Sequence, residues 1–271
     1  MPDLRTYHDW GTELERRLRL RSHPLAIRLI EDESEIPDDA VRPRSDEGHR
    51  LSLCQAFERS RRDGTAVAML GEDMWCFEPV VGYGLEEPPQ AFLEGANRYP
   101  HDVATQKAGR RYAEEFPTID VGRYVGILSA PLGSTPVEPH VVTMYLDSEQ
   151  LSLLLLGREY RGGDNLDCSL SAHAACVYGV VPAVKEGRCQ VAVPCRGDRY
   201  AAMADPDEMI ATVPTQALGP VDGRCLADVI DGLGEVEKTG SKLPSSRRKQ
   251  VEYPLSGSYE RIANEMEYFG D

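Results

Sequence analysis

An α+β fold built from two related halves is the class that the sequence predicts. Short apolar runs of strand-like length alternate with longer amphipathic patterns that are typical of helices. The order of these segments in residues 1–133 is similar to their order in residues 134–271. A chain of 271 residues with 41% hydrophobic content is long enough to build a substantial core. We therefore expect an N-terminal half, 1–133, and a C-terminal half, 134–271, packed into one unit.

The first half begins with a clear helical pattern. Residues 3–22 carry apolar side chains at roughly helical spacing, and the helix should end before Pro24, which restricts the residue before it. Residues 53–64 should form a short helix that is closed by Gly64. The other expected segments are strands at 24–32, 65–70 and 123–132, a Gly/Pro-rich loop at 80–89 and interrupted helices over 90–116.

The second half is expected to begin with a strand that runs into a helix across 139–157. Small residues over 168–184 predict one continuous helix, and a turn and strand should follow at 185–195. A helix is expected near Pro206, followed by a short strand. A brief helix at 227–233 and an amphipathic helix at 256–270 complete the predicted order.

Each half carries two cysteines on a similar helix–turn–strand unit. Cys54 and Cys76 flank the unit in the first half, and Cys176 and Cys195 flank the unit in the second. The intervals are similar, at 22 and 19 positions. If the halves pack about a pseudo-twofold axis, the four thiols converge on one site.

The composition limits the classes of partner. The formal net charge of −15 repels nucleic acid and anionic membrane surfaces, so neither is expected as a partner. The longest apolar run, 151–156, is far shorter than the roughly 20 residues that cross a bilayer. The charged N-terminus lacks the apolar stretch of a secretory signal. We expect a cytoplasmic protein.

Seven cysteines in a cytoplasmic chain do not indicate disulfides, because that compartment keeps thiols reduced. Four thiolates suit either zinc or an iron–sulfur cluster. The C-x₂-C pairs typical of structural zinc are absent, so a cluster fits slightly better, and buried structural thiols fit equally well. Cys168 or Cys189 could replace one ligand, whereas Cys225 looks like a packing residue or an exposed thiol.

The cysteine-bearing segments resemble the DUF169 family of uncharacterised bacterial and archaeal proteins. The resemblance is carried by PLAIRLIEDESEIP, by RLSLCQAFERSRRDGTAVAMLGEDMWCFEPVVGYGL, by the end of SLSAHAAC and by VAVPCRGDRYAAMADPDEMIATVP. It covers residues 24 to about 214, and the Pro-Cys-x-Gly-Asp-Arg core is its most specific part. The resemblance implies that Cys54, Cys76, Cys176 and Cys195 share a metal site, which we expect to be an iron–sulfur cluster of the [4Fe-4S] type.

Three residues near the cysteines are candidates for chemistry. Arg199 and Asp198 follow Cys195. The arginine could lower the basicity of a cluster thiolate or bind an anionic substrate, or the two residues could form a pair that fixes the loop. His173 would share a helix face with Cys176, where it could be a proton donor, a ligand or a satisfied core histidine.

Three further residues are candidates for cofactor binding. Gly197 allows close approach of the backbone. Trp75, beside Cys76, could exclude water from a cluster or simply belong to the core. Tyr83 is expected to help form the substrate pocket.

Three functions are compatible with these observations. The leading hypothesis is an iron–sulfur protein, either an oxidoreductase or a lyase, that acts on a small molecule or exchanges electrons with a redox partner. The second is a thiol enzyme or redox switch, because Cys54 at a helix start should have a lowered pKa. The third is a non-catalytic binding or scaffold protein whose cysteines belong to the core. The terminal amphipathic helices also offer apolar faces for a homodimer.

Overall fold

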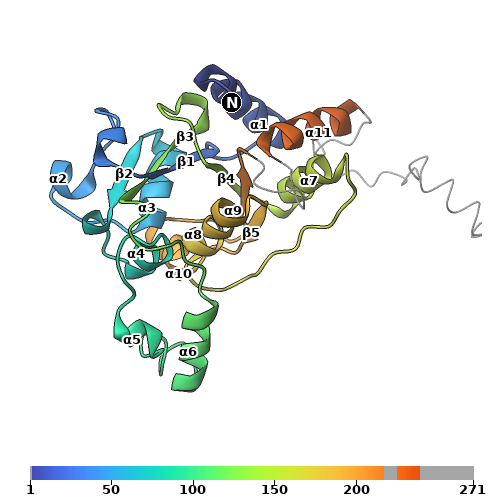
Figure 1. Cartoon of the computed structure of the whole chain (residues 1–271). Coiled ribbons are helices and arrows are strands. Elements are labelled where there is room, and N and C mark those ends of the chain that lie inside the picture. The colour runs from blue at the N-terminus through green and yellow to red at the C-terminus, as the bar shows by residue number, and fades with distance from the viewer. Residues whose placement is uncertain (1, 217–224, 239–271) are drawn as a thin grey trace, which may run out of the picture.

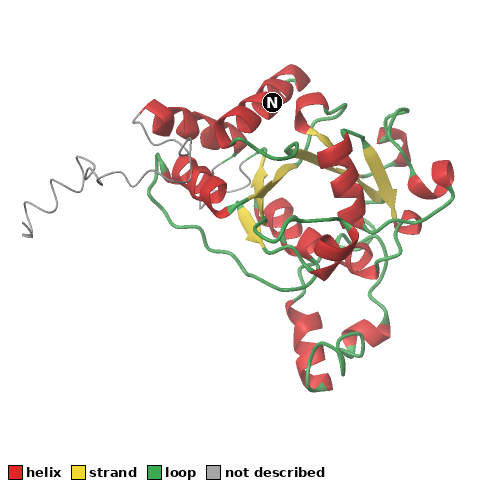
Figure 2. Cartoon of the chain, turned by 180° about the vertical axis from the view of Figure 1, so that it is seen from behind, coloured by secondary structure: helices red, strands yellow, loops and turns green. Residues whose placement is uncertain are grey.

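A single six-stranded antiparallel sheet organises the chain, as the computed structural model of residues 2–216 and 225–238 shows (Figure 2). The strand order is β2-β3-β1-β4-β6-β5. The strands span Leu25–Ile30 (β1), Val67–Leu70 (β2), Gly126–Pro131 (β3), Val141–Leu146 (β4), Gln190–Ala192 (β5) and Met209–Pro214 (β6). Helices cover the sheet, so the α+β prediction is confirmed.

The strand order has the same pattern in each half of the chain. The first strand of each half lies at the centre, the second lies at an edge, and the third lies between them. The halves join where β1 pairs with β4, with Ile27 opposite Val141. A twofold repeat would produce this order, but the repeat itself stays a prediction, as does the division at residue 133.

Two layers of helices cover the two faces of the sheet (Figure 1). One layer contains α1 (Leu4–Leu18), α7 (Ser148–Glu159) and α11 (Leu226–Lys238). The other contains α3 (Leu53–Glu58), α4 (Phe77–Gly82), α8 (Ala175–Tyr178), α9 (Val181–Glu186) and α10 (Arg196–Ala201). Alternation along β4 divides the core accordingly, because Val141 and Tyr145 face the second layer whereas Val142 and Met144 face the first.

Three short helices lie away from these layers. They are α2 (Pro43–Glu47), α5 (Gln90–Leu93) and α6 (Gln106–Glu115). Helices α5 and α6 form a lobe that projects from the body of the molecule (Figure 1). The interrupted helices expected over 90–116 are therefore present.

The first predicted helix is confirmed as α1. The Asp3 side chain accepts a hydrogen bond from the Thr6 amide at its start, and the helix ends at Arg19 in a left-handed conformation. Leu14 and Leu18 are fully buried in the core on this side of the sheet, together with side chains of β4, α7 and α11. Because the chain itself covers this apolar face, α1 does not offer it to a second copy. The C-terminal helix expected at 256–270 lies outside the described residues.

The continuous helix predicted over 168–184 is wrong. The chain is extended or bent up to Ala174, which has a φ of 46°, and only two short helices, α8 and α9, follow. Pro182 explains the second break, because proline is tolerated in the first turn of a new helix but not inside one. The helix expected near Pro206 is also wrong, since a turn leads directly into β6.

Two smaller predictions need correction. Residues 80–89 are not entirely loop, because α4 extends to Gly82. The brief helix expected at 227–233 belongs to the longer α11. Within 2–216 and 225–238, no helix is long and apolar enough to cross a membrane.

Candidate functional site

Each of the four candidate ligands lies at the start of a short helix in the second layer. Cys54 is the second residue of α3, and Cys176 is the second residue of α8. Cys76 directly precedes α4, and Cys195 directly precedes α10. All four therefore lie on the same side of the sheet, although they are far apart in the sequence.

The four thiols are near enough to influence one another. The pKa of the Cys176 thiol is raised by burial and then by interaction with Cys54, Cys195 and Cys76. The backbone amide of Ala175, next to Cys176, donates toward the Cys195 sulfur and so links α8 to the start of α10. The fold thus gathers the cysteines of both halves.

Gly197 lies beside the sulfur atoms of two cysteines. A β-carbon added at this position would lie 3.5 Å from Cys195 Sγ and 3.6 Å from Cys54 Sγ. It would meet no other atom of the described residues within 4 Å, apart from its chain neighbours. The backbone of Gly197 therefore lies beside two thiols with no side chain of its own between, and its role in cofactor binding stays a prediction.

Burial keeps these thiols protonated. Cys54 and Cys176 are buried, and burial raises the pKa of both thiols well above the usual value. Burial, and then Glu78, raises the pKa of Cys76 to about 11. Burial, and then Asp198, raises the pKa of Cys195 to about 11. Free thiols with such pKa values are weak nucleophiles at neutral pH, which opposes the lowered pKa expected for Cys54.

Among the described residues, no three His, Cys, Asp or Glu side chains converge on a point suited to one metal ion. A cluster makes a different geometric demand. Its thiolate ligands bind different iron atoms and are held apart by the body of the cluster. The donor set of four gathered thiols and the space at Gly197 fit such a group.

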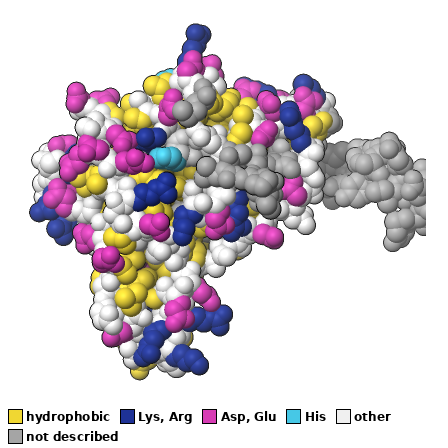
Figure 3. Space-filling view, in the orientation of Figure 1, with side chains coloured by type: hydrophobic (Ala, Val, Ile, Leu, Met, Phe, Trp, Pro, Cys, Tyr) yellow, Lys and Arg dark blue, Asp and Glu magenta, His cyan; other side chains and the backbone are white. Residues whose placement is uncertain are grey.

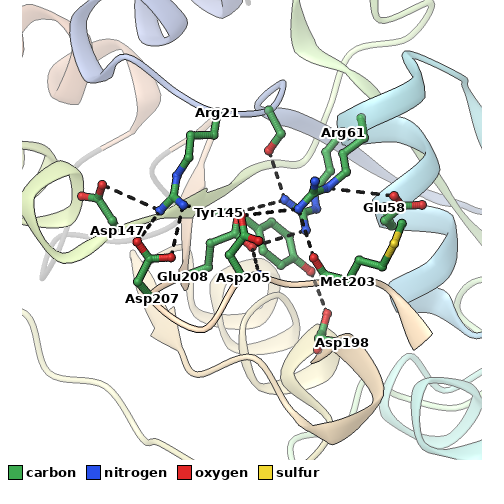
Figure 4. Close-up of polar contacts among 12 residues, drawn as sticks. Arg21, Glu58, Arg61, Tyr145, Asp147, Asp198, Met203, Asp205, Asp207 and Glu208 are labelled. Carbon is green, nitrogen blue, oxygen red and sulfur yellow. Dashed lines mark hydrogen bonds and ion pairs between the residues drawn. The ribbon is translucent and has the colours of Figure 1, made fainter. Parts of the chain in front are cut away.

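A buried chain of polar contacts runs from Cys195 through Asp198 to Tyr145, and Figure 4 shows its Asp198–Tyr145 part. Asp198 is fully buried and accepts hydrogen bonds from the Cys195 backbone N–H at 3.3 Å and from its Sγ at 3.2 Å. The Tyr145 hydroxyl donates to the other carboxylate oxygen of Asp198 at 2.8 Å. The guanidinium of Arg61 lies 4.1 Å from the centre of the Tyr145 ring. Burial raises the pKa of Asp198.

An ion pair continues this chain away from the cysteines (Figure 4). Arg61 Nη1 lies 3.0 Å from Glu208 Oε1, and both side chains are 1% exposed. The Glu208 carboxylate also accepts a hydrogen bond from the Asp205 amide at 2.8 Å, so it fixes the turn before β6. Cys195 is thereby connected to a rigid and fully desolvated support.

Cys176 is positioned by its contacts with α4. The Tyr83 hydroxyl donates to the Cys176 carbonyl oxygen at 2.8 Å, and the Tyr83 side chain is fully buried. Gly82 allows the close approach of α8, because a β-carbon there would lie only 2.4 Å from Val177 Cγ1. Tyr83 was expected to line a pocket, but the structure places it in the core, where it holds the backbone of a candidate ligand.

Cys54 is supported by the start of its own helix. The side chains of Ser52 and Gln55 cap α3 reciprocally, and Ser52 Oγ lies 3.0 Å from Cys54 Sγ. The indole of Trp75 donates to Gln55 Oε1 at 3.1 Å. Trp75 is 55% exposed, so it forms part of the surface beside the site rather than part of the core.

A second polar network lies beside Cys76. The Arg98 guanidinium pairs with Glu78, and the Tyr112 hydroxyl donates to Glu78 Oε1 at 2.9 Å. The His173 ring packs edge-on against the Tyr112 ring, with the centroids 5.7 Å apart. Partial burial, and then Arg98, lowers the pKa of His173. This network joins the site to the α5–α6 lobe, where Figure 3 shows exposed hydrophobic side chains.

Two candidate residues take other places than expected. His173 precedes α8 and does not share a helix face with Cys176, because the chain is not helical before Ala175. Arg199 donates to the Asp205 carbonyl oxygen at 3.1 Å, so it holds the loop after α10. This contact supports the prediction that Arg199 fixes the loop rather than the prediction that it binds a substrate.

The remaining cysteines belong to the other side of the sheet. Cys189 is buried in the first-layer core, and Cys168 packs against that core. The Cys225 thiol contacts the Asp228 carboxylate at 3.4 Å near the start of α11. Neither Cys168 nor Cys189 is therefore placed to replace one of the four candidate ligands.

Several residues of the site were missed from the sequence. In the sequence, nothing distinguishes Tyr145 from other strand residues, Arg61 from the basic residues around it, or Glu208 from its acidic neighbours. Their roles depend on tertiary contacts that no local pattern carries. The role of Ser52 could have been predicted, because the pattern Ser-x-x-Gln at the start of an expected helix is typical of a capping box.

A family model matches residues 13–221 of the chain. The match covers both cysteine-bearing units. The chain belongs to the DUF169 family, which is described as "Uncharacterised ArCR". This membership confirms the resemblance but supplies no reaction. Searches of curated proteins and of solved structures each returned no significant match.

Proposed function

We propose that this DUF169 protein is an iron–sulfur protein whose cluster, of the [4Fe-4S] type, is held by Cys54, Cys76, Cys176 and Cys195. The observation that carries the proposal is the gathering of four thiols from four separate helix starts, with Gly197 leaving no side chain beside two of them, Cys54 and Cys195. Thiolates are soft ligands, and iron–sulfur clusters are one of the groups, with zinc and Cu(I), that they bind well. When bound, the cluster would supply electron transfer or Lewis-acid chemistry.

The positive charge of iron explains how four buried thiols could ionise. Burial raises the pKa of each free thiol, so four thiolates without a metal would be strongly destabilised. Iron would lower these pKa values by direct bonding. The thiol-enzyme alternative lacks such compensation, and for this reason we favour the cluster.

The chain's own residues would then position the ligands. Asp198, which accepts from Tyr145, would hold the backbone N–H of Cys195, Tyr83 would hold the backbone of Cys176, and Ser52 would donate to the Cys54 sulfur. Trp75 would limit access of water from outside. An oxidoreductase or lyase role, a small-molecule or redox partner and a homodimer are extensions of this proposal.

Anaerobic purification followed by iron, zinc and acid-labile sulfide analysis tests the proposal. We expect iron and sulfide in similar amounts, with visible absorbance that dithionite bleaches. Alanine substitutions of the four ligands should each lower the iron content. Cys189→Ala is the matched control, because Cys189 and Cys176 are each 6% exposed but lie on opposite sides of the sheet.

A second variant separates loss of the cluster from loss of the fold. Gly197→Val would place a branched side chain beside Cys54 and Cys195, whose sulfur atoms already lie 3.6 and 3.5 Å from an added β-carbon. We expect a folded protein with little iron. Gly133→Val is the control, because a β-carbon at Gly133 would meet no atom of residues 2–216 and 225–238 within 4 Å, its chain neighbours and its own helical turn excepted. Iron-free wild-type protein, or zinc in place of iron and sulfide, would refute the cluster.

A further inference from the structure

A cavity lies apart from the four candidate ligands. Its volume is about 380 Å³, within the range of small-molecule sites. Arg28 of β1 and His140, just before β4, contribute polar groups to it, and Glu138 and Thr215 line it as well. Val184 of α9 is among the side chains that form its apolar wall. None of the four candidate ligands lines this cavity.

The hydrogen bonds of His140 define its protonation. The Leu29 amide donates to His140 Nδ1 at 3.1 Å, so this nitrogen is the acceptor of a neutral ring. The proton of a neutral imidazole must then lie on Nε2. Burial, and then Arg28, lowers the pKa of His140 to about 4, so the neutral form prevails at neutral pH. Within the described residues, Nε2 has no hydrogen-bond partner, which leaves one N–H donor for a ligand.

Arg28 supplies further donors from the neighbouring strand. Its Nη2 donates to Glu35 at 3.0 Å, and among the described residues its other guanidinium nitrogens form no hydrogen bond. A guanidinium has five N–H groups, so several remain for a carboxylate. Arg28 and His140 line one cavity, and a carboxylate between them would accept bonds from both.

Glu138 and the apolar wall restrict the ligand further. A carboxylate ligand alone would be repelled by Glu138, unless it also carried a cationic or donor group toward that side chain. Val184 and Pro214 offer apolar contact for a short aliphatic chain. A small aliphatic amino acid combines these three features.

We infer that this cavity binds a small aliphatic α-amino acid, with its carboxylate at Arg28 and His140, its ammonium group at Glu138 and its side chain against Val184 and Pro214. The inference is independent of the proposed cluster. It depends on the convergence of two donors, one carboxylate and an apolar wall in a single cavity of suitable size.

Isothermal titration of the full chain with L-valine tests this inference. We expect saturable binding of L-valine and at least tenfold weaker binding of isovalerate, which lacks the amino group, and of isobutylamine, which lacks the carboxylate. Imidazole ¹⁵N spectra should show a shift of the His140 Nε2 signal on binding. No saturable binding, or isovalerate binding as tightly as L-valine, would overturn the inference.

Two variants test the location of the site. Arg28→Gln should weaken binding at least tenfold, whereas Arg111→Gln, at an exposed arginine of α6, should not. Val184→Trp should abolish binding by filling the cavity while leaving the polar groups in place. Far-UV circular dichroism checks that each variant is folded. Unchanged binding by folded Arg28→Gln and Val184→Trp proteins would place the ligand elsewhere and contradict the inference.

Discussion

Replacing Glu208 with glutamine should destabilise the protein strongly, because it leaves the buried charge of Arg61 without its partner. Both side chains are 1% exposed, and two guanidinium nitrogens lie 3.0 and 3.4 Å from the two carboxylate oxygens. After the substitution, Arg61 would retain the Ser22 hydroxyl at 3.2 Å and the ring of Tyr145. These contacts do not neutralise the charge.

The expected cost follows from the complete burial of the pair. Removing one partner of such a pair costs about 3–5 kcal/mol of the free energy of unfolding. For a chain of this size, that loss corresponds to a fall in Tm of roughly 6–20 °C. Urea unfolding followed by far-UV circular dichroism measures the free energy, and a thermal scan measures Tm. A Glu208→Gln protein within about 0.5 kcal/mol of the wild type would refute the reasoning.

A double-mutant cycle isolates the charge pair from other effects. Arg61→Met alone should also be costly, whereas Arg61→Met combined with Glu208→Gln should cost about 2–3 kcal/mol less than the sum of the single changes. The exposed pair of Arg111 and Glu115 is the control, with side chains 77% and 63% exposed. Its cycle should give a coupling below about 0.5 kcal/mol. Additive costs at the buried pair would contradict the proposed coupling.

Three further outcomes are expected. Tyr145→Phe removes the hydroxyl that binds Asp198, so iron retention during dialysis should fall; equal retention would exclude a positioning role. Gly232→Ala should cost about 2–3 kcal/mol in urea unfolding, because its β-carbon would lie 1.9 Å from the Gly157 carbonyl oxygen between α11 and α7; wild-type stability would contradict this packing. The pKa of His140 is lowered from 6.5 to about 4 in the folded protein, so as the pH falls the unfolded chain takes up a proton at this residue before the folded chain does. The free energy of unfolding should therefore fall by at most about 3 kcal/mol between pH 6.5 and pH 4. His140→Gln should have a shallower pH profile, and identical profiles would rule out this contribution.

Local patterns in the sequence predicted the elements whose periodicity is strong. The apolar stripe of residues 3–22 predicted α1, and the short apolar runs 65–70 and 123–132 predicted β2 and β3. These patterns succeed because the side chains of each element must face one core. The ends differ by a few residues, since caps such as the left-handed Arg19 depend on backbone geometry.

The failures occurred where tertiary contacts override composition. Residues 168–184 have helix-compatible small side chains, but Ala174 takes a left-handed conformation and Pro182 begins a separate helix. The segment around Pro206 forms a turn, and the nearby Glu208 carboxylate binds the Asp205 amide. Neither outcome follows from local propensity.

The candidate site was predictable in its ligands but not in its supports. Four cysteines could be selected because each pair flanks a similar unit and because the family resemblance includes them. The contact of Tyr145 with Asp198 joins β4 to α10, and the contact of Arg61 with Glu208 joins residues of different halves. Contacts between residues so far apart in the sequence form only after the sheet has been assembled.

Iron and sulfide analysis of anaerobically purified wild-type and Gly197→Val proteins tests the central claim most directly. We expect about four iron and four sulfide per wild-type chain, as for one [4Fe-4S] cluster. We expect the variant to stay folded but to lose most of both. Wild-type protein without iron, or a folded Gly197→Val protein with the full iron content, would contradict a cluster beside Cys54 and Cys195.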